Sequence, residues 1–265
     1  MTQAPTILVF DSGLGGLTVY REVTAARPDA RFIYAADDAA FPYGGWTELA
    51  LSERVVSVIG ALIKQYEPDL VVIACNTAST LVLAELRRRF SIAFIGTVPA
   101  IKPACAASRS RLVSVLGTEA TIAREYTRTL IRDYGEGCEI TLVGARRLAP
   151  LAEAHLRGEP ADPRIVAEEI APCFVEQGGR RTDTVVLACT HFPLLLEALG
   201  AAAPWPVTFI DPARAIAHRV IDLLGPARPE PRQTARIHFT SGAAPAPRLS
   251  AALGAFGFAL APADA

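Results

Sequence analysis

Short, fully apolar runs alternate with longer amphipathic stretches along most of the chain. The strands expected in the first half are residues 6–10, 31–35, 70–74 and 92–97. The helices expected between them are residues 47–66 and 79–89, and the first repeats its apolar positions every three to four residues. Apolar runs without alternation suit strands that are buried on both faces. The pattern therefore predicts an α/β fold with mostly parallel sheets.

The second half of the chain repeats this plan. Its expected strands are residues 112–116, 139–143 and 184–188, and its expected helices are a stretch ending near residue 134 and residues 162–177. Matched pieces of the two halves are separated by about one half-chain, which is the signature of an internal repeat. We therefore expect two similar α/β domains built from a duplicated unit, with a cleft between them.

The last 60 or so residues have no counterpart in the first half. A strand ending at Asp211, a helix to about residue 224 and a Pro-rich connection precede two expected strands at residues 236–240 and 256–260. We expect this tail to return to the first domain. The predicted division is then residues 1–98 plus 208–265 for the first domain and 99–207 for the second.

One sequence pattern occurs once in each half, and in both copies its apolar run ends in a cysteine. Residues 69–77 read DLVVIACNT and residues 183–191 read DTVVLACTH, so Cys75 and Cys189 both follow a buried strand. Open α/β sheets bind ligands at this end of their strands. Each thiol is also expected near the N-terminus of the next helix, where the helix dipole favours a thiolate. The other cysteines, Cys105, Cys138 and Cys173, are interpreted as buried apolar residues.

Three chemistries use two cysteines in this way. A redox pair is disfavoured because a cleft would hold the two sulfurs apart. Zinc is disfavoured because one residue separates Cys189 from His191 and no histidine is near Cys75 in sequence. The third chemistry is proton transfer on opposite faces of one substrate, in which one thiolate takes a proton and the other thiol returns one. The duplication favours this third interpretation.

A glycine-rich loop, DSGLGGLTV, follows the first strand. Its spacing fits neither GxGxxG nor GxxxxGK[ST], so neither a dinucleotide site nor a P-loop is predicted, and no organic cofactor is expected. Gly13, Gly15 and Gly16 allow a tight turn and close approach of the backbone. The loop offers amide groups and a helix N-terminus to a carboxylate, with Asp11 and Ser12 at its mouth.

The composition excludes several classes of protein. A net charge of −1 with 20% charged residues gives no reason to expect a nucleic acid or an anionic membrane as partner. No apolar run reaches the roughly 20 residues of a membrane-spanning helix, and no leader is visible, so a cytoplasmic location is expected. The five cysteines are odd in number and widely spaced, which argues against a disulfide framework.

Six motifs together resemble a known family, the cofactor-independent glutamate racemases of the aspartate/glutamate racemase superfamily. They occur in family order and extend the resemblance to about residue 224. The motifs are FDSGLGGLTV (10–19), FPYGG (41–45), ACNTAST (74–80), GTEATI (117–122), LAPLAE (148–153) and ACTHFPLL (188–195).

The resemblance implies two facing α/β domains with the active site between them, and interconversion of L- and D-glutamate to supply D-glutamate for peptidoglycan. It implies that Cys75 deprotonates the D-enantiomer and Cys189 the L-enantiomer, without a cofactor or metal. Asp11, His191 and Glu153 match residues that assist the thiols. Positions that match substrate-binding residues are Asp11, Ser12, Pro42, Tyr43, Gly44, Asn76, Thr77, Thr118, Thr121, Thr190 and His191. A homodimer is compatible with the family.

Several of these positions also have ordinary structural interpretations. Asp11 could serve only as a turn or capping residue, and Thr118 and Thr121 could serve only to start a helix. His191 could be a core histidine that is satisfied by backbone groups. Tyr43 could simply pack its loop. Capping by Asn76 and Thr77 is compatible with substrate contact, because both use the same strand end.

The chain departs from the family at two places. In the usual GDTARxPYG pattern the threonine is replaced by Asp38 and the arginine by Ala40, and the late IDSG is replaced by residues 210–213, IDPA. A new acid and a lost base affect how well a dicarboxylate is received. The alternatives are racemisation of aspartate or another amino acid derivative, or a non-catalytic protein that binds an amino acid or inhibits DNA gyrase. The presence of both cysteines argues against an inactive relative.

Overall fold

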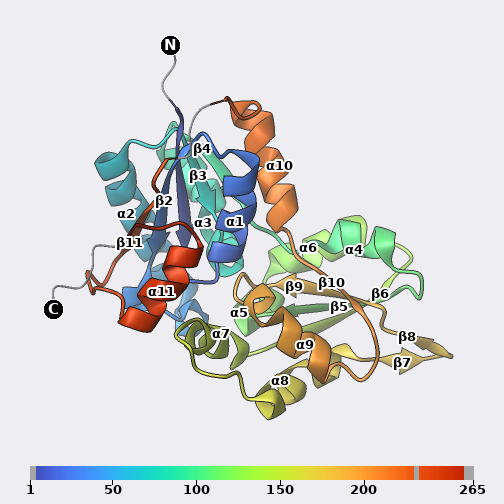
Figure 1. Cartoon of the computed structure of the whole chain (residues 1–265). Helices are drawn as coiled ribbons and strands as arrows, with labels where there is room; N and C mark the ends of the chain where they lie inside the picture. The colour runs from blue at the N-terminus through green and yellow to red at the C-terminus, as the bar shows by residue number, and fades with distance from the viewer. Residues whose placement is uncertain (1–3, 230–232, 260–265) are drawn as a thin grey trace.

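The computed structural model describes residues 4–229 and 233–259 and contains two parallel β-sheets, each covered by helices on both faces (Figure 1). The predicted α/β fold class is therefore confirmed. All strand pairs of the two main sheets run parallel. Among the described residues, none of the helices has both the length and the apolar composition that crossing a bilayer requires.

The first sheet has five strands in the order β11-β2-β1-β3-β4. The strands are β1 (Thr6–Asp11), β2 (Arg31–Ala36), β3 (Leu70–Ile73), β4 (Ala93–Gly96) and β11 (Arg236–Phe239). One face packs against α1 (Leu17–Ala26), α10 (Ala213–Leu224) and α11 (Pro247–Ala255). The other face packs against α2 (Glu48–Tyr66) and α3 (Asn76–Arg89).

The second sheet has four strands in the order β10-β9-β5-β6. The strands are β5 (Leu112–Gly117), β6 (Glu139–Gly144), β9 (Thr184–Ala188) and β10 (Thr208–Ile210). One face packs against α7 (Leu148–Leu156), α8 (Pro163–Ile170) and α9 (Leu196–Ala202), and the other against α4 (Ile101–Ala107) and α6 (Glu125–Tyr134). The short helix α5 (Glu119–Ala123) follows β5.

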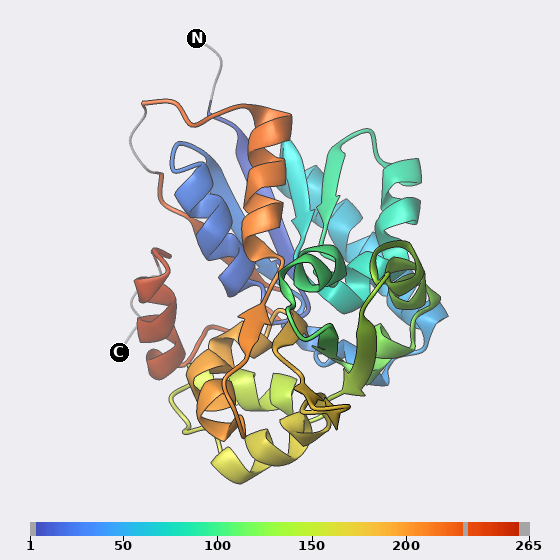
Figure 2. The ribbon, with the colours of Figure 1, turned by 90° about the vertical axis from the view of Figure 1, so that its right-hand side faces the viewer.

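The two sheets share one topology. Counted in chain order within each half, the strands lie side by side as 2-1-3-4, with β11 added at the edge next to β2. Strands β3 and β9 are the third strand of each unit, and every residue in both is buried. Cys75 and Cys189 follow these strands, so equivalent positions of the repeat deliver both thiols. Figure 2 shows the two lobes one above the other, with α10 lying beside α1 on the first.

The predicted helix over residues 162–177 is wrong in its second half. Helix α8 ends at Ile170 and is followed by a 3₁₀ turn, η3 (Ala171–Cys173). Pro172 has no N–H for the helical hydrogen bond, which explains the early end. The chain then forms a hairpin of β7 (Glu176–Gln177) and β8 (Arg180–Arg181), whose turn contains two glycines with positive φ.

The predicted helices next to the strand ends also differ from the observed ones. Helix α3 starts at Asn76, directly after Cys75, and not at residue 79. The helix expected after residue 117 is broken into α5 and α6 at Arg124, where the backbone is extended. Helices α4, α7 and α11 were not predicted, because each is too short to show a clear apolar period.

One element of the C-terminal part was predicted incorrectly. The expected strand at residues 256–260 is reduced to one bridge between Phe258 and Ala235, because α11 continues to Ala255 and Gly257 has a positive φ. Residue 260 lies outside the described residues. Strand β10 pairs with β9, so it belongs to the second sheet, although the predicted division assigned residues from 208 onward to the first domain. The division into domains otherwise stays a prediction.

Candidate active site

The carboxyl ends of β1 and β3 in the first sheet and of β5 and β9 in the second border one pocket. Most of the substrate-binding positions expected from the sequence lie in its wall. The lining residues are Ser12, Phe41, Pro42, Tyr43, Gly44, Cys75, Asn76, Thr77, Thr118, Ala149, Cys189, Thr190 and His191. Phe41 and Ala149 were missed, although both lie inside motifs that the sequence analysis had singled out. Cys75 and Cys189 reach this pocket from different lobes.

Cys75 lies between β3 and α3 in apolar surroundings. Its side chain is buried and donates a weak hydrogen bond to Ser12 Oγ at 3.7 Å. Burial, together with the nearby charge of Asp11, raises the pKa of the Cys75 thiol to about 12, although a backbone hydrogen bond from Ala78 opposes the rise. The expected thiolate at this helix N-terminus is therefore not favoured without a ligand, because desolvation outweighs the helix dipole.

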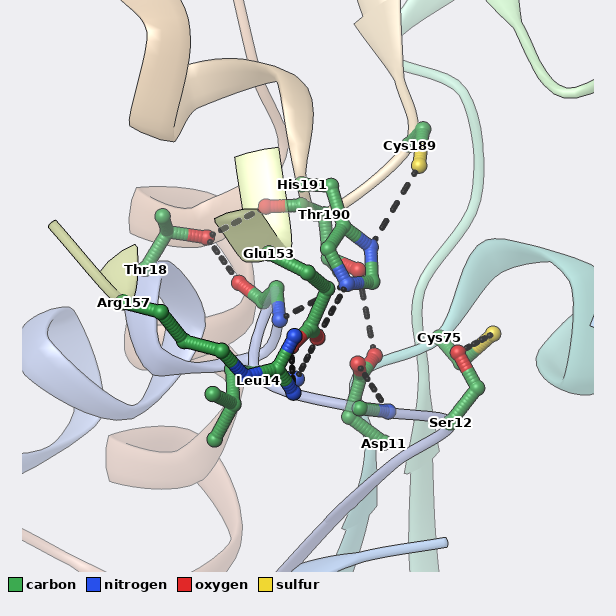
Figure 3. A network of polar contacts seen from close by, with 12 residues as sticks. Asp11, Ser12, Leu14, Thr18, Cys75, Glu153, Arg157, Cys189, Thr190 and His191 are labelled. Carbon is green, nitrogen blue, oxygen red and sulfur yellow. Dashed lines mark hydrogen bonds and ion pairs between the residues drawn. The ribbon is translucent and has the colours of Figure 1, made fainter. Parts of the chain in front are cut away.

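Cys189 has an imidazole as its partner. Its sulfur lies 3.8 Å from His191 Nδ1, and His191 Nε2 lies 2.9 Å from Glu153 Oε1 (Figure 3). Burial lowers the pKa of His191, but hydrogen bonds with Cys189 and Glu153 outweigh it and raise the pKa well above its ordinary value. Cys189 is followed by a 3₁₀ turn, η4 (Phe192–Leu195), and not by the α-helix expected there. The positive group next to the Cys189 sulfur is therefore the imidazolium of His191 and not the N-terminus of a helix.

Glu153 is held in position by groups from both lobes. Its carboxylate accepts hydrogen bonds from the backbone N–H of Leu14 at 2.5 Å and from Arg157 Nη2 at 3.1 Å. Burial raises the pKa of Glu153, but His191, Leu14 and Arg157 together bring it below the ordinary carboxyl value. Arg157, which caps the C-terminal end of α7, was not predicted, although it follows Glu153 by four residues.

Asp11 links the end of β1 to the opposite lobe. Its carboxylate accepts from the backbone N–H of Gly13 at 3.0 Å and from Thr190 Oγ1 at 3.1 Å, while Thr18 Oγ1 donates to the Thr190 carbonyl at 3.2 Å. Burial raises the pKa of Asp11, and the positive charge of His191 opposes that rise. Asp11 thus has both the predicted turn contact and a contact with a pocket residue. Neither Asp11 nor Glu153 lines the pocket; both contact residues that do.

The glycines of the first loop are required by close approach between the lobes. A Cβ on Gly13 would lie 2.4 Å from Glu153 Oε1, and a Cβ on Gly15 would lie 2.4 Å from His191 Nδ1. Neither glycine has a positive φ in the described backbone. The loop can therefore lie against Glu153 and His191 only because it has no side chains at these two positions.

Three threonine hydroxyls connect the lobes on another side of the pocket. Thr77 Oγ1 at the start of α3 lies 3.1 Å from the hydroxyls of both Thr118 and Thr121, which lie 2.9 Å from each other. Thr118 also caps α5 by accepting from the Thr121 N–H. Thr121 does not line the pocket itself. Thr118 therefore caps a helix and lines the pocket at once, whereas Thr121 is connected to the pocket wall through Thr77 and Thr118.

Asn76 is a buried polar side chain with unused hydrogen-bonding capacity. Both its Oδ1 and its Nδ2 lack a hydrogen-bond partner among the described residues, and the side chain lines the pocket. A buried amide without partners costs free energy unless a ligand or water satisfies it. The first N–H groups of α3 likewise have no partner inside the helix. This corner can therefore bind a polar, anionic group.

Of the residues that the structure describes, no arginine or lysine lines the pocket. A bound carboxylate would have to be held by hydroxyls, amides and helix N-termini. Within residues 4–229 and 233–259, no group of three or more His, Cys, Asp or Glu side chains is arranged to hold a metal ion. The site therefore offers two thiols, one imidazole–carboxylate pair and a set of uncharged hydrogen-bonding groups.

Comparison with known proteins agrees with this arrangement. The family model for Asp/Glu/hydantoin racemases matches residues 16–220. A glutamate racemase of Brucella anthropi is 59% identical over 223 residues, which cover 84% of this chain and 80% of the relative. The crystal structure of Escherichia coli glutamate racemase with L-glutamate and an activator, UDP-MurNAc-Ala, superposes with a TM-score of 0.88 at 39% identity and covers 96% of each chain. The chain belongs to the Asp/Glu/hydantoin racemase family.

Proposed function

We propose that this protein interconverts L- and D-glutamate without a cofactor, and that Cys75 and Cys189 are its two catalytic acid–base groups. The observation that carries the proposal is that these thiols, from different lobes, line one pocket. The 59% identity with a glutamate racemase supports glutamate as the substrate. We further propose that the D-glutamate serves peptidoglycan synthesis.

The proposed reaction moves two protons and needs no other reactant. The thiolate of one cysteine removes the α-proton of the bound enantiomer and becomes a thiol. The thiol of the other cysteine gives its proton to the opposite face of the same carbon and becomes a thiolate. The product is the mirror-image amino acid, and the two cysteines have exchanged protonation states. The reverse reaction then starts from the second cysteine.

The surroundings of the two thiols differ in charge. His191, with a raised pKa, provides a positive charge 3.8 Å from the Cys189 sulfur, whereas the Cys75 sulfur contacts the Ser12 hydroxyl. We propose that the His191 cation assists Cys189 when this residue takes the α-proton of the enantiomer whose α-proton faces it.

Negative charge that develops on the substrate must be stabilised by fixed dipoles. Asn76 and Thr77 at the start of α3 and Thr118 at the start of α5 offer such donors next to the thiols. The side-chain amide of Asn76, which has no partner among the described residues, can donate a hydrogen bond to this negative charge. Because the described residues of the pocket wall include no arginine or lysine, and His191 is paired with Glu153 and Cys189, we propose that these neutral groups hold the α-carboxylate and the side-chain carboxylate.

The acid at position 38 does not argue for a different substrate. Asp38 is absent from the pocket wall, and its carboxylate accepts from the backbone N–H of Ser241 at 2.9 Å and from Ser241 Oγ at 2.6 Å. It therefore faces the C-terminal segment. The replacement of the family's arginine by Ala40 does leave a shorter, uncharged side chain beside the loop.

Circular dichroism of free amino acids tests this proposal directly. Purified protein incubated with L-glutamate, without any added cofactor, is expected to reduce the signal to zero, and D-glutamate should give the same endpoint. Aspartate and a neutral amino acid are run in parallel, and turnover of either in preference to glutamate would shift the substrate assignment. Binding of glutamate with no loss of signal over many hours would indicate a non-catalytic protein instead.

A further inference from the structure

One buried carboxylate, Asp37, fastens the segment between β2 and α2 that forms part of the pocket wall. This segment supplies Phe41, Pro42, Tyr43 and Gly44 to the pocket. The side chain of Asp37 is fully buried, yet it does not line the pocket itself. Its Oδ2 accepts a hydrogen bond from the Tyr43 hydroxyl at 2.6 Å. The position of a pocket residue thus depends on this carboxylate.

Two further groups, distant in sequence, complete the surroundings of Asp37. Arg54 of α2 binds both carboxylate oxygens, with Nε at 2.8 Å and Nη2 at 2.6 Å. Thr240, 203 residues further along the chain, donates its hydroxyl to Oδ1 at 2.6 Å. Each oxygen therefore accepts one hydrogen bond from Arg54 and one from a hydroxyl. Bidentate contacts of this kind fix the plane of the carboxylate.

The backbone connects the same cluster to the catalytic region. The N–H of Asp37 donates to the carbonyl of Asp11 at 2.9 Å, so the segment starts beside the end of β1. Thr240 directly follows β11, and its N–H donates to the carbonyl of Ala36 at 3.0 Å. The Thr240 hydroxyl lies 3.3 Å from the N–H of Ala39, from which it can accept. A residue near the C-terminus therefore holds both ends of a short turn next to the pocket.

The charges of the cluster are matched. Burial raises the pKa of Asp37, but Arg54, Thr240 and Tyr43 outweigh it, and the pKa lies below the ordinary carboxyl value. Burial and the charge of Asp37 raise the pKa of Tyr43, so the phenol keeps its hydrogen and donates it to Asp37. The Tyr43 hydroxyl is consequently committed to Asp37, and Tyr43 can contact a substrate through its ring and backbone.

We propose that Asp37 is a positioning residue for substrate binding, and that Thr240 of the C-terminal segment is part of the same positioning system. This inference rests on the proposed racemase function. It gives the tail after α10 a role in the site, although the tail has no counterpart in the repeat. It also accounts for Asp38, whose bonds with Ser241 attach the same turn to the same segment.

The experiment measures KM and kcat for glutamate in variants that remove one hydroxyl at a time. Thr240→Val keeps the shape of the side chain and loses the hydrogen bonds of the hydroxyl with Asp37, Asp38 and Ala39. We expect KM to rise roughly five- to tenfold with kcat changed by less than about twofold, because a displaced wall weakens binding before it affects the thiols. Thr240→Ser should restore the original KM. Thr141→Val, the same change on β6 of the second sheet, should leave KM unchanged.

A double variant distinguishes positioning from general loss of stability. Thr240→Val and Tyr43→Phe both act through Asp37, so their combined effect on KM should be smaller than the product of the single effects. Effects that multiply would overturn the proposal, as would an unchanged KM in Thr240→Val or a fall in kcat alone. If Thr240→Val fails to fold, Tyr43→Phe combined with Asp37→Asn provides the same comparison. Absence of turnover in the unsubstituted protein would instead contradict the proposed function.

Discussion

Cys75 and Cys189 occupy the same place in the two repeats but have different neighbours. Cys75 has the hydroxyl of Ser12 at 3.7 Å and lies at the start of a helix of 14 residues. Cys189 has the imidazole of His191 at 3.8 Å, which Glu153 supports from the other side. Equivalent positions of the two repeats thus deliver two sulfurs, of which Cys189 has an imidazole–carboxylate pair as its partner and Cys75 a neutral hydroxyl.

This difference suggests a division of labour within one reaction. Enantiomers have equal free energies in water, so kcat/KM must be the same in both directions for every variant. The unequal surroundings can therefore appear only in kcat and KM taken separately, or in reactions that stop halfway. Exchange of the α-proton with solvent is such a half-reaction, and it reports each thiol individually.

The largest expected effect comes from removing either thiol. Cys75→Ala and Cys189→Ala should each lower racemisation by at least about a thousandfold, because general acid–base groups contribute about 10²–10⁴-fold and no side chain replaces them. In D₂O, each variant should still exchange the α-proton of one enantiomer, and the two variants should choose opposite enantiomers. Near-normal racemisation in either variant, measured by circular dichroism, would exclude the two-thiol mechanism.

A smaller effect, and one that sharpens the comparison, comes from the partners of the thiols. His191→Asn removes the cation beside Cys189 and should lower kcat about a hundredfold, near the lower end of an acid–base contribution. Ser12→Ala removes only a weak hydrogen bond to Cys75 and should lower kcat by less than about tenfold. Initial rates with L- and D-glutamate give kcat for both variants. Equal losses in the two variants would show that the unequal surroundings have no kinetic importance.

The smallest expected effect concerns stability and compares the acids that precede β3 and β9. Asp183 accepts hydrogen bonds from Ser108 and from the N–H groups of residues 109 and 110 at 2.7–2.8 Å. Burial alone would raise the pKa of Asp183, but these bonds lower it to about 2. Asp69, the matching acid of the first repeat, accepts a hydrogen bond from the N–H of Thr6.

Asp183→Asn should therefore reduce the free energy of unfolding by roughly 1–2 kcal/mol at pH 7, after allowance for partial solvent exposure. Because the folded pKa is lowered, this stabilisation is present above the unfolded pKa of 3.8 and is lost as the pH falls from about 4 to 2. Urea unfolding at several pH values measures it. An equal or larger loss in Asp69→Asn would contradict the inequality between the two acids.

The strands were the easiest part of the fold to predict from the sequence. Continuous apolar runs such as residues 70–74 and 184–188 can be satisfied only by burial on both faces, so they report the parallel sheets without tertiary information. Helix ends were predicted less well. Pro172 ends α8 early. The break between α5 and α6 at Arg124 cannot be recognised from the spacing of apolar residues. The short helices α4 and α11 lack enough turns for a clear apolar period.

The sequence by itself predicted two equivalent thiols, since Cys75 and Cys189 each follow the apolar run of a repeated motif. It could not determine their neighbours. The contact of Glu153 with Leu14 joins residues 139 positions apart, and that of Thr240 with Asp37 joins residues 203 positions apart. Sequence patterns report how a segment buries its own side chains, whereas such contacts depend on how the lobes and the tail pack together. Only the tertiary structure therefore decided that one thiol faces an imidazole and that the C-terminal segment supports the pocket.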